Sequence, residues 1–185
     1  MEKELKKYLL QQARATIAEE LDVQVEAPPS PDVEILKEKR GVFVTLEINH
    51  RLRGCIGNIE AVYPLEEGVR RNAINAAFRD PRFPSLTKEE FSRVEIEISV
   101  LSVPRQLNYS STEELLEKLT PLKDGVIIKQ GYFEATYLPQ VWEDLKDKED
   151  FLSSLSIKAG LNPDAWKDPE TEIFTYQAEV FKEED

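Results

Sequence analysis

The sequence predicts an α+β fold in which an antiparallel sheet is flanked by helices. Segments of alternating apolar residues come in pairs joined by short connections, at 41–59 and 125–138, and such hairpins form antiparallel sheet. Helical patterns precede and separate these pairs instead of following every strand, which argues against a doubly wound parallel sheet. We expect one domain over 1–185, because the segment 22–40 is too short to separate two folding units.

An amphipathic helix is expected over about 1–21. Apolar residues recur there at every fourth position: Leu5, Leu9, Ala13, Ile17 and Leu21. This spacing places them on one helical stripe, which is the face that packs on a core. The prolines at positions 28, 29 and 31 cannot continue the helix, so it ends before them.

A β-hairpin is expected over about 41–59, and its register decides where the only cysteine lies. A two-residue loop at 49–50 would place Cys55 opposite Val44, with the core. A three-residue loop at 49–51 pairs Cys55 with Thr45 instead, and a one-residue slip exchanges the two faces.

We favour the three-residue loop because of the residues around the cysteine. It puts Leu52 and Ile56 on the apolar face and keeps Arg53 off the core, opposite Glu47. In this register Arg53 and Cys55 point the same way, and a cation beside a thiol lowers its pKa.

The later elements follow from periodicity and from capping residues. They are a helix from Leu65 to Arg79, a strand from Val94 to Val100, a short helix capped by Thr112, a hairpin over 125–138, a helix from Gln140 to Ala159 closing at Gly160, and a strand from Ile173 to Phe181.

Composition excludes several classes of protein. With 24 Lys+Arg against 36 Asp+Glu, the net charge is −12, so binding to nucleic acid or to an anionic membrane is not expected. One Cys and one His allow neither an internal disulfide nor a Cys/His zinc site, and we expect no metal and no cofactor.

No apolar run matches a signal peptide or the ~20 residues of a membrane span. We therefore expect a cytoplasmic protein, and the Lys- and Glu-rich composition hints at a thermophilic source.

Six of the ten arginines lie within 51–82, a segment without lysine. The planar fork of Arg suits carboxylate or phosphate groups, so one interpretation is a site for a small anionic ligand. Arg79 and Arg82 bracket Asp80, which could orient either of them. The other interpretation is that these arginines pair internally with the many Glu residues.

Cys55 also has two interpretations. It is either a reactive or ligand-contacting thiol, with Gly54 and Gly57 leaving room for a ligand, or a small buried hydrophobic residue. His50 is the only histidine, and five residues of extended strand separate it from Cys55 by about 16 Å. A Cys–His dyad is therefore not expected.

The segment Leu52-Arg53-Gly54-Cys55-Ile56-Gly57 resembles the signature hexapeptide of the AMMECR domain family, which is named for a human chromosomal region linked to Alport syndrome, midface hypoplasia and elliptocytosis. The resemblance continues in order along almost the whole chain. Its further blocks are Pro64-Leu65, Asn72-Ala73-Ile74, 76–83, 95–102, 124–127, 138–143 and 158–161.

This resemblance implies one α+β domain with a larger and a smaller lobe around a cleft lined by the 53–57 segment. Relatives are often encoded beside, or fused to, Memo-like proteins and radical-SAM enzymes, so the resemblance implies a modification pathway shared with these proteins and makes them the expected partners. Relatives commonly have Cys at the position of Ser156, so a second thiol is not expected to act here.

Two functions remain open at this point. In the first, the chain is an enzyme in which Cys55 is the nucleophile or acid–base group, Arg53 stabilises the thiolate, and Arg79 and Arg82 hold an anionic substrate. In the second, the chain is a binding module or accessory subunit for a small anion or a partner protein. A nucleic-acid binder is the weakest alternative at this net charge.

Overall fold

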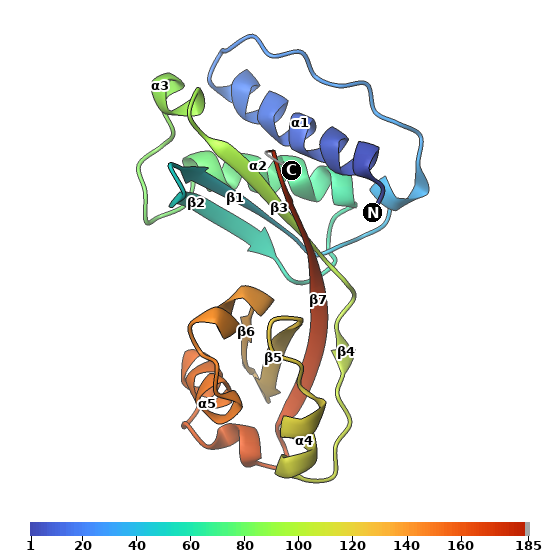
Figure 1. The fold of residues 1–185 in the computed structure, drawn as a ribbon, viewed down its shortest axis with the longest axis vertical. Helices are drawn as coiled ribbons and strands as arrows, with labels where there is room; N and C mark the ends of the chain where they lie inside the picture. Colours follow the sequence, from blue (N-terminus) through green and yellow to red (C-terminus); the bar gives the residue numbers. More distant parts are fainter. Residues whose placement is uncertain (184–185) are drawn as a thin grey trace. The chain divides into compact units, whose positions relative to one another are not determined.

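The computed structural model describes residues 1–183 and has the α+β architecture that the sequence predicts (Figure 1). The chain divides into two compact units. Among the described residues, the larger unit contains 1–101 and 179–183, and the smaller unit runs from Ser102 to Ala178.

The α-helices are α1 (Lys3–Glu20), α2 (Leu65–Phe78), α3 (Lys88–Phe91), α4 (Thr112–Lys118) and α5 (Lys148–Lys158). The strands are β1 (Val42–Ile48), β2 (Arg51–Asn58), β3 (Glu95–Leu101), β4 (Arg105–Gln106), β5 (Asp124–Gln130), β6 (Phe133–Tyr137) and β7 (Glu172–Lys182). Short 3₁₀ helices are η1 (Glu34–Leu36), η2 (Pro139–Glu143) and η3 (Ala165–Lys167). Within residues 1–183, no helix has the length and apolar character needed to cross a bilayer.

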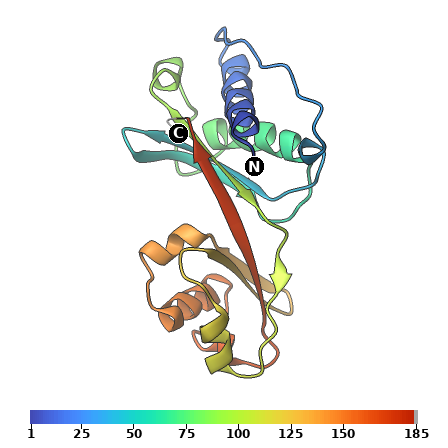
Figure 2. The same ribbon diagram turned by 45° about the vertical axis from the view of Figure 1, so that its right-hand side comes forward.

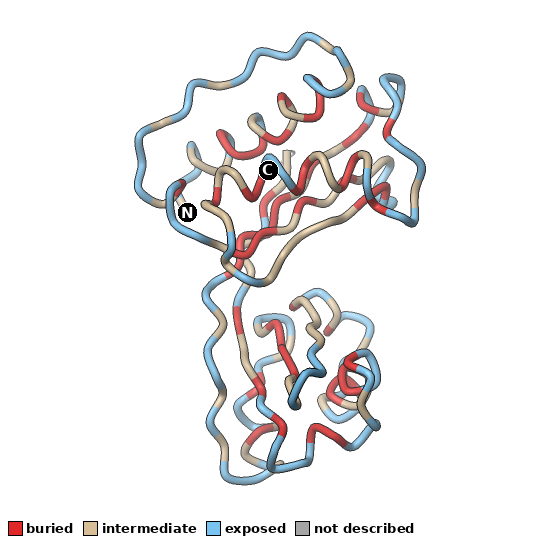
Figure 3. Tube along the Cα trace, turned by 180° about the vertical axis from the view of Figure 1, so that it is seen from behind, coloured by how far each residue is buried: buried red, intermediate tan, exposed pale blue. Residues whose placement is uncertain are grey.

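In the larger unit, α1 and α2 cover one face of a β-sheet (Figure 2). Strand β1 lies between β2 and β3 and pairs antiparallel with both. The side chains on the covered face follow the two-residue alternation of strands, and Figure 3 colours the buried residues red. On β1 and β3 the buried side chains of this face are Val42, Val44, Leu46, Ile96, Ile98 and Val100.

The opposite face of the same sheet is more polar. The alternating positions there are Phe43, Thr45, Glu47, Cys55, Glu95 and Glu97. The alternation that builds the core therefore also places the thiol and three carboxylates on one surface.

The smaller unit has its own hydrophobic core, and its strands pair antiparallel. Strand β5 pairs antiparallel with β6 and β7, and β4 pairs with β7. The rings of Trp142 and Phe151 stack with centroids 3.6 Å apart. Both tryptophans of the chain, Trp142 and Trp166, are buried in this core.

The register of the first hairpin is as expected at Cys55 and different at the tip. Cys55 lies opposite Thr45, as predicted. The loop, however, has two residues, Asn49 and His50, both with positive φ, and the first pair beyond it is Ile48 with Arg51. The expected three-residue loop is wrong.

A β-bulge reconciles the short turn with the expected pairing. Glu47 pairs with Leu52 but Leu46 pairs with Gly54, so Arg53 is the extra residue on β2. The prediction that Arg53 faces Glu47 is therefore wrong. Leu52 was expected on the apolar face, yet it is 43% exposed. It lies between the turn and the bulge, where the register still differs from the expected one by one residue.

Two helix boundaries also differ from the sequence prediction. The N-cap of α4 is Ser111, whose Oγ accepts from the Glu114 N–H, and Thr112 is the first helical residue. The helix expected from 140 to 159 is two elements, η2 and α5. Asp147 interrupts it, because its side chain caps α5 by accepting from the N–H groups of Glu149 and Asp150.

Candidate functional site

Cys55 lies on β2, at the edge of the larger unit's sheet. Its side chain is half-buried and faces Thr45, whose Oγ1 donates a hydrogen bond to Sγ over 3.2 Å. The backbone N–H of Cys55 points away from β1 and donates to Asp80 Oδ2 over 2.9 Å. The cysteine is therefore held through both its side chain and its backbone.

Burial raises the pKa of the Cys55 thiol above its ordinary value. The hydrogen bond from Thr45 and the charge of Arg82 lower this pKa, while the charges of Asp80 and Glu97 raise it. The outcome is a thiol that stays protonated at neutral pH, which is the opposite of what a nucleophilic cysteine requires.

Asp80 is the centre of the arrangement around Cys55. It is only 4% exposed and accepts hydrogen bonds from the Arg82 side chain, from the Arg82 backbone N–H and from Cys55. The hydrogen bonds from the Arg82 guanidinium hold the pKa of this carboxyl well below its usual range. A buried, ionised carboxylate thus links the loop after α2 to the edge of β2.

Arg82 is fixed by Asp80 and remains open to solvent. Its Nε and Nη2 donate to Asp80 over 3.0 and 2.8 Å, and Nη2 also reaches the carbonyl oxygen of Cys55 over 3.3 Å. Its side chain is nevertheless 55% exposed to solvent. We call Cys55, Asp80 and Arg82 the Cys55 corner.

Arg53 does not belong to this corner, although it is two residues from Cys55. Its Nε and Nη2 donate to the two carboxylate oxygens of Glu90 over 2.8 and 2.9 Å, and Nη2 also donates to the Pro84 carbonyl. The side chain is buried. The predicted pairing of Arg53 with the thiol is therefore wrong, because the bulge turns Arg53 toward α3.

The other predicted ligand residues lie outside the corner. Arg79 is exposed and bonds to the Asn75 side chain. A Cβ at Gly54 would lie 2.1 Å from the Ala76 carbonyl oxygen, and one at Gly57 would lie 2.2 Å from the Phe43 ring. Close packing therefore explains why neither position carries a side chain. A ligand role for the two glycines stays a prediction.

Among the described residues, one group of three side chains could hold a metal ion, and it is not the Cys55 corner. It consists of Glu47, His50 and Glu95.

Glu90 and Phe83 are residues of this region that sequence reasoning missed. Glu90 neutralises Arg53, and the Phe83 ring lies 5.8 Å from the Arg53 guanidinium and 5.6 Å from that of Arg82. A signal for Glu90 was present, because Thr87 and Glu90 have the spacing of a capping box. The structure contains both reciprocal bonds of that box at the start of α3.

The AMMECR1 family model matches residues 10–181 of this chain. The chain belongs to the AMMECR1 family. The family match spans both compact units and includes every residue of the Cys55 corner.

Similar AMMECR1-type proteins come from archaea. A protein of Nanoarchaeum equitans is 42% identical over 158 residues, which are 84% of this chain and 88% of the relative. A protein of Methanopyrus kandleri is 40% identical over 182 residues, covering 96% of this chain and 88% of the relative. The crystal structure of an uncharacterized protein from Pyrococcus horikoshii superimposes with a TM-score of 0.86 at 38% identity, covering 100% of this chain and 94% of that one.

Ser156 replaces the cysteine that the resemblance leads us to expect in other AMMECR1 proteins. Its side chain is fully buried in the smaller unit, and Oγ donates to the Leu152 carbonyl over 2.8 Å. Cys55 is consequently the single thiol of this AMMECR1 family member.

Proposed function

We propose that this AMMECR1 family member is a non-catalytic binding module in which Arg82 recognises a carboxylate or phosphate group of a partner protein. The observation that carries the proposal is the bonding of Asp80 and Arg82 to the two backbone polar groups of Cys55. This bonding fixes a largely exposed guanidinium beside the signature segment. A guanidinium that is already oriented loses less conformational entropy when it binds an anion.

The state of the thiol supports a binding role over a catalytic one. Burial raises the pKa of Cys55, so little thiolate exists at neutral pH. The histidine that could act as its base, His50, groups instead with Glu47 and Glu95 at the hairpin turn. Arg53, the cation expected to stabilise a thiolate, is neutralised by Glu90.

For the partner, we propose the Memo-like or radical-SAM proteins beside which relatives are encoded. The net charge of −12 makes an anionic partner surface unfavourable as a whole. The proposed contact is therefore local, between one acidic group of the partner and Arg82.

The test is a calorimetric titration of the full chain with the purified Memo-like and radical-SAM proteins of its own genome. Arg82→Gln removes the guanidinium, and we expect it to weaken binding about 10-fold or more, since one charge-assisted contact amounts to at least about 1.4 kcal/mol. Arg79→Gln is the matched control, because Arg79 lies three residues away and outside the corner. It should change the affinity less than about twofold.

Two results would contradict the proposal. One is the absence of binding to either candidate partner. The other is an Arg82→Gln chain that binds as tightly as the wild type or as the Arg79→Gln chain.

The enzyme alternative has one specific observation in its favour. The Thr45 hydroxyl donates to Sγ, and both this bond and the Arg82 charge lower the pKa of the thiol. A measured thiol pKa well below that of a free cysteine would show that these two effects outweigh burial, and Cys55 would then be a candidate nucleophile.

A further inference from the structure

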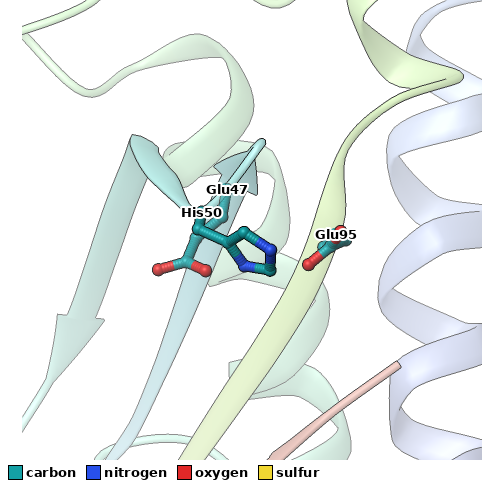
Figure 4. Close-up of side chains that lie close together, drawn as sticks. All are labelled: Glu47, His50 and Glu95. Carbon is teal, nitrogen blue, oxygen red and sulfur yellow. The ribbon is translucent and has the colours of Figure 1, made fainter. Parts of the chain in front are cut away.

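Three side chains from separate strands and a turn converge at the tip of the first hairpin. They are Glu47 of β1, His50 of the turn and Glu95 at the start of β3 (Figure 4). A nitrogen of the imidazole and one oxygen of each carboxylate all lie within 4.8 Å of one another. The figure shows the imidazole between the two carboxylates.

The two carboxylates form an unfavourable pair without a cation. Glu47 and Glu95 are direct partners in the β1–β3 register, and like charges directly opposite each other destabilise a sheet. In addition, Glu95 Oε2 is buried and has no hydrogen-bond partner. A buried acceptor without a partner lowers the free energy of unfolding by about 1–3 kcal/mol. The Glu95 carboxylate therefore lacks a hydrogen-bond donor or a cation.

The hairpin turn orients the third side chain. Asn49 and His50 have φ angles of 53° and 58°, the left-handed conformation that a two-residue hairpin turn requires at both positions. The short turn holds the imidazole close to the strand ends, and the exposure of His50 leaves the group accessible to an ion from solvent.

We propose that Glu47, His50 and Glu95 bind a divalent first-row transition-metal ion of the Zn²⁺ type. An imidazole nitrogen with two carboxylate oxygens is a donor set for such ions, whereas Mg²⁺ and Ca²⁺ prefer oxygen donors alone. The ion neutralises the opposed carboxylates and supplies a partner for the Glu95 carboxylate. Three protein ligands leave a further position for water.

Binding requires only a small local adjustment. Ligand atoms about 2.1 Å from a tetrahedral Zn²⁺ ion lie about 3.4 Å apart. The donor atoms here are separated by up to 4.8 Å, so side-chain movements of about 1 Å bring them to the separation that the ion requires. This inference is independent of the proposed binding function, because no atom of the Cys55 corner takes part in it.

Zn²⁺ titration against a competing chromophoric chelator measures the site, and Co²⁺ serves as a spectroscopic probe. We expect one ion per chain and a Co²⁺ spectrum without the intense near-ultraviolet band of cobalt–thiolate coordination, since Cys55 is not a ligand. His50→Gly and Glu95→Gln should each weaken Zn²⁺ binding by about 10- to 100-fold. Glu60→Gln, an exposed carboxylate of the same unit, is the matched control and should leave binding unchanged within about twofold.

His50→Gly separates loss of a ligand from loss of the fold. Glycine accepts positive φ, and Asn-Gly is a favoured two-residue hairpin turn, so this variant is expected to unfold at the wild-type temperature in the absence of metal. Zn²⁺ should then raise the melting temperature of the wild type but not of His50→Gly.

The proposal is overturned by any of three results. They are the absence of saturable one-to-one Zn²⁺ binding, equal affinity of His50→Gly and the wild type, and a cobalt–thiolate band in the Co²⁺ spectrum.

Discussion

At the residue scale, Arg53 and Cys55 have different roles although they are neighbours in one short motif. Arg53 is buried and bonds to Glu90, while Cys55 bonds to Asp80 and Thr45. The bulge at Arg53 separates the two residues, because the extra residue changes the direction in which the side chain points. Arg53 therefore stabilises the fold, whereas Cys55 is part of the Cys55 corner with Asp80 and Arg82.

The Arg53–Glu90 pair should contribute measurably to stability. We predict that Glu90→Gln lowers the free energy of unfolding by about 2 kcal/mol, because a buried guanidinium loses its charged partner. The measurement is urea denaturation of wild type and variant.

The control for this variant is Glu67→Gln. Glu67 pairs with Arg71 on the exposed side of α2 at i,i+4 spacing, and such pairs contribute about 0.3–0.5 kcal/mol. Equal effects of the two substitutions would refute the assignment of a structural role to Arg53.

Stability should also depend on pH through the same pair. The hydrogen bond from Arg53 lowers the pKa of Glu90 to about 2, against about 4.3 in an unfolded chain. A carboxyl with a depressed folded pKa stabilises the fold above the unfolded pKa, and this contribution is lost as pH falls through the folded one. Asp80, whose pKa is lowered by Arg82, acts in the same direction.

We therefore predict that the melting temperature falls between about pH 4.5 and pH 2, and that it falls less steeply in Glu90→Gln. Melting curves by circular dichroism across this range provide the test. Parallel pH profiles for variant and wild type would exclude the pair as a source of the acid sensitivity.

At the element scale, the close approach of β2 and α2 depends on one missing side chain. A Cβ at Gly54 would lie 2.1 Å from the Ala76 carbonyl oxygen, and neither backbone can move without disturbing the sheet or the helix. We predict that Gly54→Ala destabilises the protein by about 3 kcal/mol, as measured by thermal or urea denaturation.

Gly131→Ala is the comparison for this prediction. Gly131 has a positive φ of 59° but nothing within 4 Å of an added Cβ, so the substitution should cost about 1 kcal/mol from backbone strain alone. If Gly54→Ala cost no more than Gly131→Ala, the packing of α2 against β2 would not depend on Gly54.

The sequence predicted the helices and strands better than the residues at which they begin and end. The strands at 42–48 and 95–101 and the helix at 3–20 follow from periodicity, because each buries one regular face. The two-residue turn at Asn49 and His50 was missed, because local alternation does not reveal a bulge that compensates for a shorter loop. The break at Asp147 was missed because apolar residues continue on both sides of it.

The candidate site was predictable only in part for a related reason. The motif identified Cys55, Asp80 and Arg82, which the structure brings together. The partner of Arg53 and the convergence of Glu47 with Glu95 depend on how distant segments pair in space. One sequence carries no direct signal for such pairing.

At the scale of the whole molecule, the net negative charge makes binding to a nucleic acid unfavourable. The net charge is −12, and in the larger unit the most buried arginine is already paired. We predict no gel shift with single-stranded RNA or duplex DNA at about 0.15 M salt, because binding would bring two polyanions together. A shift that weakens as salt rises would instead indicate a phosphate-binding surface.

The reactivity of Cys55 distinguishes the proposed binding module from a cysteine-dependent enzyme. The measurement is the alkylation rate of the folded protein against pH, and because Cys55 is the only thiol the signal has one source. For a non-catalytic, partly buried Cys55 we expect slow labelling with a midpoint above the ~8.5 of a free cysteine, returning to the ordinary midpoint in denaturant. Rapid labelling with a midpoint well below that value would show that Cys55 is an accessible, stabilised thiolate of the kind that nucleophilic enzymes use, and the non-catalytic role would be wrong.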